Sequence, residues 1–246
     1  MIWFIIATLV AFFIKGLCGF ANTLIFNGIL SYTANNINIS PLEVVLGYPS
    51  NIILVWKERK SLNWKIWLPL TALVVAGSIP GIFLLKHTDA GLLKVIFGIA
   101  VIVIGVEMLF REMKSNRESS NRKPGGSKLV LVLIGIISGL LCGLYGVGAL
   151  LAAYVSRVAE NSHEFKANIC VVFVVENTIR IILYVATGIL TLSVLKQVVI
   201  LIPFMLVAVF LGMKSSSVLN EKIIKKIVII LLILSGIVLI INNIPG

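Results

Sequence analysis

Residues 129–155 read LVLVLIGIISGLLCGLYGVGALLAAYV, an apolar run that glycines interrupt near its middle. Residues 2–32, IWFIIATLVAFFIKGLCGFANTLIFNGILSY, have the same layout near the start of the chain. Each run is too long for one ordinary membrane span, which takes about 20 residues of helix. Irregular backbone inside a bilayer is tolerated only where protein or a cavity surrounds it. Both runs are therefore predicted to be glycine-broken helical segments, and they decide the fold.

The rest of the chain is also strongly apolar. Of its 246 residues 59% are hydrophobic and 13% are charged, whereas about a quarter of the residues in a soluble domain are charged. This composition excludes an ordinary soluble enzyme, and runs that are apolar on every side exclude a spanning β-barrel. We predict one all-α polytopic membrane domain over 1–246. Its further apolar runs are 42–56, 64–85, 92–110, 167–187, 197–213 and 227–241.

The two halves of the chain look like repeats. LCGF at 17–20 matches LCGL at 141–144, and each half continues with a short polar-centred run and then two plain apolar runs. A polar stretch that contains Pro-Gly-Gly separates the halves, as a solvent-exposed linker does. The predicted division is repeat one at 1–110, a cytoplasmic linker at 111–128 and repeat two at 129–246.

Basic residues predict how the repeats are oriented, because short cytoplasmic loops carry the excess of Lys and Arg. If every run crosses once, the loops on the two sides carry 11 and 8 basic residues. If run 129–155 returns to the side that it enters, the counts become 16 and 3. The second arrangement inverts the second repeat, and symmetry then places both termini outside. Its cytoplasmic loops are 57–65, 111–128, 156–166 and 214–226.

The paired glycine breaks, the polar linker and the two-repeat layout resemble the TauE/SafE family of sulfite-exporter-like membrane proteins, over about 5–241. The family pattern has a G-F-G-G-G-like run after each first half-helix. Here GF at 19–20 is followed by ANT, and GVG at 146–148 is followed by AL. The resemblance implies a transporter of a sulfur-containing anion, such as sulfite, thiosulfate or an organosulfonate.

The glycine breaks are the first candidate site. Exposed amides and helix N-termini at a break inside the membrane can hold an anion. The alternative is that small residues merely let helices pack closely. We favour the site because breaks occur at matching positions in both repeats. Its predicted substrate-binding residues are Gly19, Phe20, Asn22, Gly143, Tyr145, Gly146 and Gly148.

Glu176 and Arg180 form the second candidate site. They lie four residues apart near the middle of run 167–187 and so share one helix face. A charge at that depth costs about 3 kcal/mol and is expected to face a cavity or a partner. Arg180 would attract an anion and Glu176 would exchange the coupling proton, or the two form a static ion pair. Asn177, Ser50 and Asn51 are further polar candidates for substrate binding.

Three other side chains have weaker functional interpretations. Lys15 either assists the anion or extends to a membrane interface, and the second is favoured if run 2–32 enters the membrane only to a shallow depth. Cys18 and Cys142 occupy matching positions but are expected to behave as small apolar residues. No metal-ligand set, catalytic set or nucleotide-binding loop is recognised, so we expect no metal, cofactor or enzymatic activity.

The sequence thus predicts a multi-pass secondary transporter in a prokaryotic cell membrane. Its expected partners are a small anion, the lipid bilayer and protons as the coupling ion, with no nucleic acid; the oligomeric state is left open. The sulfur-containing substrate follows only from the resemblance. Two alternatives are a passive anion channel and a membrane thiol-redox protein that uses Cys18 and Cys142.

Overall fold

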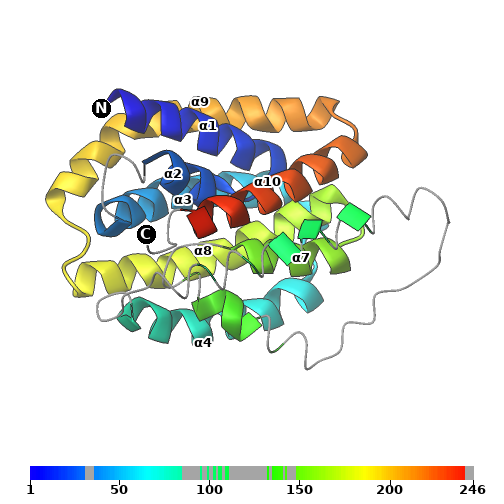
Figure 1. Ribbon diagram of the computed structural model, residues 1–246, viewed down its shortest axis with the longest axis horizontal. Coiled ribbons are helices and arrows are strands. Elements are labelled where there is room, and N and C mark those ends of the chain that lie inside the picture. The colour runs from blue at the N-terminus through cyan, green and yellow to red at the C-terminus, as the bar shows by residue number, and fades with distance from the viewer. Residues whose placement is uncertain are drawn as a thin grey trace.

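The computed structural model describes a layered bundle of helices (Figure 1). Nothing but helices and their connections occurs in the residues that it describes, which are 1–30, 36–84, 95, 99, 102–103, 105–106, 109–110, 132, 135–140, 142 and 148–241. The elements are α1 (Ile2–Cys18), α2 (Asn22–Leu30), α3 (Asn36–Glu58), the 3₁₀ turn η1 (Arg59–Ser61), α4 (Trp64–Leu84), α7 (Ala149–Val158), α8 (Ser162–Ala186), α9 (Leu192–Val218) and α10 (Glu221–Ile241).

Three stretches of helix in the described part are long and apolar enough to cross a membrane. They are Ile39–Ser61, Ser162–Ala186 and Leu192–Val218, and Ile2–Cys18 is a shorter apolar helix. Large hydrophobic side chains stay exposed along these helices, for example Val199 and Phe210 on α9. Such side chains are costly in water, so lipid is their natural solvent. The prediction of an all-α membrane protein is confirmed.

Two spanning helices are longer than their apolar runs. The first turns of α3 contain Asn36, Asn38 and Ser40, so apolar character begins only after the helix has started. At the start of α8 the Asn161 side chain accepts a hydrogen bond from the Glu164 N–H at 2.9 Å and caps the helix. Hydropathy detects the buried middle of a helix and misses such polar ends.

The first broken run forms a helical hairpin, as the sequence predicts. α1 ends at Cys18 and α2 begins at Asn22. The Phe12 and Phe26 rings pack edge to face with their centroids 6.4 Å apart, so α2 turns back along α1. Because both helices lie against the remainder of the bundle (Figure 1), their break is enclosed by protein.

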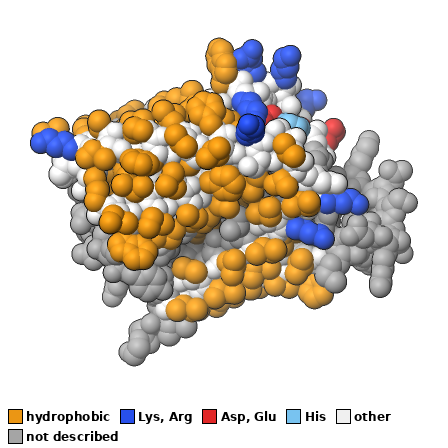
Figure 2. Space-filling model, turned by 90° about the horizontal axis from the view of Figure 1, so that it is seen from above, with side chains coloured by type: hydrophobic (Ala, Val, Ile, Leu, Met, Phe, Trp, Pro, Cys, Tyr) orange, Lys and Arg blue, Asp and Glu red, His pale blue; other side chains and the backbone are white. Residues whose placement is uncertain are grey.

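Three connecting loops lie at the same end of the molecule. His163 Nδ1 and Glu58 Oε2 are 2.8 Å apart, and Asn63 Nδ2 donates to Glu164 Oε1 at 2.9 Å. Lys57 Nζ donates to the Met213 carbonyl at 3.4 Å. These contacts group the loops 57–65, 156–166 and 214–226, which is the grouping expected if run 129–155 returns to the side that it enters. Figure 2 shows most of the visible Lys and Arg side chains at one end of an otherwise hydrophobic face.

Glycines allow two close helix crossings. A Cβ on Gly212 of α9 would lie 2.1 Å from the Phe13 carbonyl oxygen of α1, and Gly16 of α1 meets Gly212. A Cβ on Gly139 would lie 2.2 Å from the Val74 carbonyl oxygen of α4, opposite Gly77. Real Cβ atoms do not approach backbone oxygen so closely, so these four glycines are packing residues.

Candidate functional site

At the first break, deep in the bundle, Gly19 and Ala21 adopt left-handed backbone conformations. Gly19 ends α1 with φ 88° and donates its N–H to the Lys15 carbonyl at 2.7 Å. Ala21 has φ 73°, a conformation that costs a residue with a side chain about 1–2 kcal/mol. Cys170 Sγ donates to the Gly19 carbonyl at 3.3 Å. Because Cys170 lies about two turns, or ~12 Å, inside α8, the break is far from the loop end of the molecule.

The described part of the second break is the start of α7. Gly148 is buried and directly precedes the helix. A Cβ on Gly148 would lie only 2.3 Å from Cζ of Phe173, so glycine is needed where α7 meets α8. Three candidates from the sequence, Gly143, Tyr145 and Gly146, lie outside the described residues.

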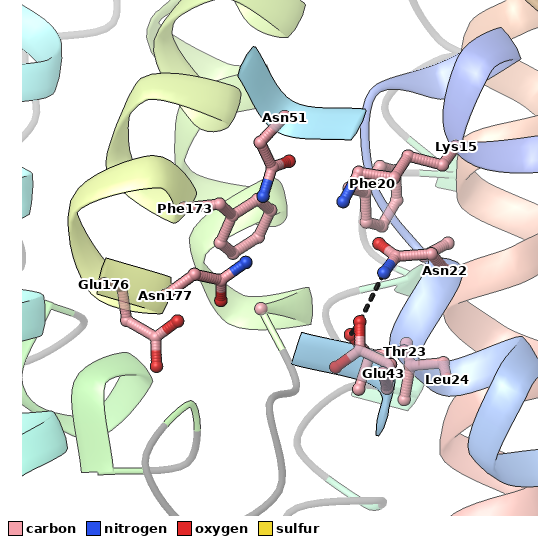
Figure 3. Close-up of a pocket in the computed structure, with 12 residues that line it drawn as sticks. Lys15, Phe20, Asn22, Thr23, Leu24, Glu43, Asn51, Phe173, Glu176 and Asn177 are labelled. Atoms are coloured by element: carbon pink, nitrogen blue, oxygen red, sulfur yellow. Dashed lines mark hydrogen bonds between the residues drawn. The ribbon is translucent and has the colours of Figure 1, made fainter. Parts of the chain in front are cut away.

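A polar cavity lies between the start of α2, the start of α7 and the helices α3 and α8 (Figure 3). The space in it that is open to the centre of a water-sized molecule is about 20 Å³. Asn22 and Glu43 lie on one side, Glu176 and Asn177 lie on the other, and Asn51 lies between them. The lining residues are Lys15, Phe20, Ala21, Asn22, Thr23, Leu24, Glu43, Asn51, Gly148, Phe173, Glu176 and Asn177.

Glu43 joins α3 to the first turn of α2. Its Oε1 accepts hydrogen bonds from the Asn22 side-chain amide and from Thr23 Oγ1, the latter at 2.8 Å. Glu43 is only 3% exposed. Glu43 was not among the site residues predicted from the sequence. The signal was available, since an acidic residue inside the apolar run 42–56 is a candidate functional group by default.

Lys15 is part of the cavity, and the expectation that it extends to a membrane interface is wrong. It is 1% exposed, and its Nζ donates to the Gly47 carbonyl at 3.5 Å. The hairpin of α1 and α2 explains the difference, because it places the last turn of α1 inside the bundle. Lys15 therefore supplies a buried positive charge at the cavity.

Two lining side chains have polar atoms to which none of the described residues offers a hydrogen bond. Glu176 Oε1 is one of them, and both amide atoms of Asn51 are the others. Glu176 is 2% exposed and Asn51 is fully buried. Leaving a buried polar atom unpaired costs about 1–3 kcal/mol. The cavity therefore offers unused hydrogen-bonding capacity to a bound molecule.

Arg180 lies beside the cavity and is held by other groups. Its Nε donates to Tyr184 Oη at 3.0 Å, and its Nη2 donates to Ser40 Oγ at 2.6 Å. Within the described residues no ion pair joins Arg180 to Glu176. Arg180 is 1% exposed, so its charge still acts on Glu43 and Glu176 through the protein interior.

The structure thus brings together part of the predicted site. Gly19 shapes the break without lining the cavity, and the Ser50 hydroxyl donates to the Gly47 carbonyl at 2.7 Å. Lys15, Thr23, Glu43 and Phe173 line the cavity but were not assigned to the site from sequence. The predicted residues that do line it are Phe20, Asn22, Asn51, Gly148, Glu176 and Asn177.

A helical membrane bundle with a broken helix and a buried charged cavity has the architecture of a membrane transporter. The model of the family described as Sulfite exporter TauE/SafE matches residues 4–239. The chain belongs to this family, as the resemblance in its sequence indicated, and the family is one of membrane transporters. No curated protein and no solved structure matches the chain.

Proposed function

We propose that the protein is a secondary transporter of a small sulfur-containing anion and works by alternating access around the cavity. The observation that carries this proposal is the set of unpartnered atoms of Asn51 and Glu176, which are buried and line the cavity. A bound anion can accept a hydrogen bond from Asn51 Nδ2 and, once Glu176 is protonated, one from its carboxyl group, which offsets part of this desolvation. The family supports transport, and the cavity supplies the place for the transported molecule.

Several positive groups around the cavity favour an anion. Lys15 lines it with a buried amine. The N-termini of α2 and α7 both reach it, and a helix start carries about half a positive charge in addition to free N–H groups. The side-chain amides of Asn22, Asn51 and Asn177 can donate to sulfonate or sulfite oxygens. We assign these groups to substrate binding.

The charges at the cavity explain why a proton would travel with the anion. Lys15 and Arg180 balance Glu43 and Glu176 when all four groups are ionised. An arriving monoanion leaves one unbalanced negative charge in a region of low dielectric, which is costly. A proton on Glu176 removes this charge. We therefore assign proton coupling to Glu176, while Arg180 acts through its field from behind Ser40 and Tyr184.

Reciprocal packing supports two inverted repeats, the design that many alternating-access transporters share. Gly16 of repeat one crosses Gly212 of repeat two, and Gly139 of repeat two crosses Gly77 of repeat one. In each crossing the first helix of one repeat packs on the first of the two plain helices of the other repeat. A two-fold axis in the membrane plane exchanges the two crossings.

The basic end of the molecule supports the proposed orientation. The loops 57–65, 156–166 and 214–226 share this end and face the cytoplasm by the positive-inside rule. The N-terminus lies at the opposite end (Figure 1), which favours an outside position for it. We propose a multi-pass protein of the prokaryotic cell membrane.

Transport by purified protein in proteoliposomes tests the function. Labelled thiosulfate, sulfite and methanesulfonate are offered with a pH gradient, acidic on the side of the anion. We expect at least one of them to accumulate above its equilibrium level. Movement that stops at equilibrium would identify the anion channel, and no movement of any probe would contradict the proposal.

Two variants refine this experiment. Glu176→Gln is expected to exchange substrate across the membrane but no longer to accumulate it in response to pH. The combination of Cys18→Ser and Cys142→Ser should transport like the wild type, whereas the thiol-redox alternative requires both thiols. Loss of activity in the double cysteine variant, with normal folding, would favour that alternative.

A further inference from the structure

We propose that Glu43 is an internal anion, which occupies the substrate's position at the start of α2 and leaves it only when protonated. The inference rests on the proposed function and names the group that regulates anion binding. Nothing in the sequence pattern assigned a role to this residue. Its evidence is the placement of one carboxylate among the donors that an anion would need.

The contacts of Glu43 are those of a bound anion. Its Oε1 accepts from the Asn22 amide and from the Thr23 hydroxyl, both on the first turn of α2. That turn is the positive end of the helix dipole and the part of the helix with free N–H groups. Figure 3 shows the bond between Glu43 and Asn22 at the edge of the cavity. Substrate oxygens and Glu43 would compete for these donors.

Gly47 lets Glu43 and two amide groups lie close to the backbone of α3. It lies one helical turn after Glu43, on the same face of α3. A Cβ on Gly47 would be 3.3 Å from Glu43 Oε1, 3.5 Å from Asn177 Nδ2 and 3.6 Å from Asn22 Nδ2. A side chain at this position would press on Glu43 and on both amide donors, so glycine keeps the three groups together.

Charged side chains of the described helices α1 and α8 interact electrostatically with Glu43. Lys15 of α1 and Arg180 of α8 favour its carboxylate, whereas Glu176 of α8 opposes it, and the Cys142 thiol lies within electrostatic range. An anion beside an ionised Glu43 would add a like charge to this group, which favours protonation. A second proton, taken from the solution in addition to the one on Glu176, then neutralises Glu43 and frees Asn22 and Thr23 for a dianion such as thiosulfate.

A second observation points to a ligand in the same cavity. Asn51 and Glu176 line the same cavity, are almost fully buried and keep unpartnered polar atoms. Glu43 satisfies the donors of α2 but leaves these atoms unused. A substrate that displaces Glu43 can accept from Asn51 Nδ2, and from Glu176 when its carboxyl group is protonated, and this gain offsets part of the cost of releasing the carboxylate.

Proton uptake on anion binding tests this proposal. Thiosulfate is the probe, because it stays fully ionised between about pH 6 and about pH 8, so any pH dependence belongs to the protein. Titration calorimetry in buffers of different ionisation enthalpy gives the protons taken up per thiosulfate bound. We expect Glu43→Gln to take up about one proton fewer than the wild type and to bind at least about tenfold tighter at about pH 8.

Glu43→Asp separates competition from charge, and it also serves if the Gln variant does not fold. It keeps the carboxylate but shortens its reach by one methylene, so its oxygen no longer reaches the Asn22 and Thr23 donors that Glu43 Oε1 occupies. We expect it to bind thiosulfate more tightly, like Glu43→Gln, but to keep the proton uptake, because its carboxylate still lies beside the anion. The control Glu176→Gln should keep the proton that belongs to Glu43.

The possible results lead to different conclusions. If Glu43→Gln takes up as many protons as the wild type, or if neither Glu43 variant binds thiosulfate more tightly, Glu43 is a structural link between α2 and α3 and the proposal is overturned. Loss of thiosulfate binding in both variants would overturn it as well. If the wild type binds neither thiosulfate, sulfite nor methanesulfonate, the proposed function itself fails, and the internal anion fails with it.

Discussion

At the scale of single residues, burial changes what a charged side chain can do. Lys15 is 1% exposed beside a cavity that also holds two carboxylates. We predict that Lys15→Met weakens anion binding at least tenfold, since two charges about 4 Å apart interact by about 4 kcal/mol near a protein surface. Lys15→Arg should retain part of the affinity. Isothermal titration with thiosulfate measures both.

Lys57→Met is the matched control for Lys15. Lys57 is exposed at the basic end, where its Nζ donates to the Met213 carbonyl at 3.4 Å. Its removal should leave thiosulfate affinity unchanged. Equal losses of thiosulfate affinity in the two variants would mean that Lys15 acts only through the net charge of the protein. Lys15 would then have no specific role in binding the anion.

Ala21 stores backbone strain at the break. Its φ of 73° suits glycine better than alanine. We predict that Ala21→Gly raises the free energy of unfolding by about 1 kcal/mol, seen as a higher midpoint of thermal unfolding in detergent. Ala11→Gly, at a buried position inside α1, should lower it by a similar amount. A lower midpoint for Ala21→Gly would show that Ala21 is not strained.

At the scale of helices, the contact between α7 and α8 depends on a missing side chain. A Cβ on Gly148 would lie 2.3 Å from Phe173 Cζ and 2.4 Å from its Cε1. We predict that Gly148→Ala pushes the Phe173 ring into the cavity and lowers transport about tenfold or more, with insertion retained. The overpacking itself typically costs about 1–3 kcal/mol.

Combining Gly148→Ala with Phe173→Leu tests this explanation. The smaller side chain gives the new methyl group room, so the double variant should recover most of the transport that Gly148→Ala loses. Transport rates in proteoliposomes, normalised to the folded protein, provide the comparison. An additive loss would show that Gly148 acts through its backbone and not through the space beside Phe173.

Hydropathy along the sequence can locate those helices whose middle part is apolar. The breaks, the helices α8 and α9 and the polar centre of α3 at Asn51 were predictable in this way. Lys15 and Glu43 were harder to assign, because Glu43 lies at the edge of run 42–56 and Lys15 lies beside a break whose depth in the membrane hydropathy does not give. Their place in the cavity depends on the hairpin of α1 and α2 and on the polar extension of α3, both of which are tertiary facts.

At the scale of the whole molecule, the loops 57–65 and 214–226 are predicted to lie on the same, cytoplasmic side of the membrane. Single cysteines replace the exposed residues Lys60, Ser217 and Ser193 on a cysteine-free background. A membrane-impermeant thiol reagent should modify Lys60→Cys and Ser217→Cys only from the cytoplasmic side and Ser193→Cys only from outside. Modification of Lys60→Cys and Ser217→Cys from opposite sides would contradict the inverted repeats.

The central claim is that the cavity is the anion's site and opens alternately to both sides, and a cysteine at position 51 tests it most directly. Asn51 is buried and lines the cavity. On the cysteine-free background, Asn51→Cys should react with a small impermeant thiol reagent added from either side, and thiosulfate should slow both reactions. Failure to react from either side, or reaction rates that no transported anion changes, would contradict the account.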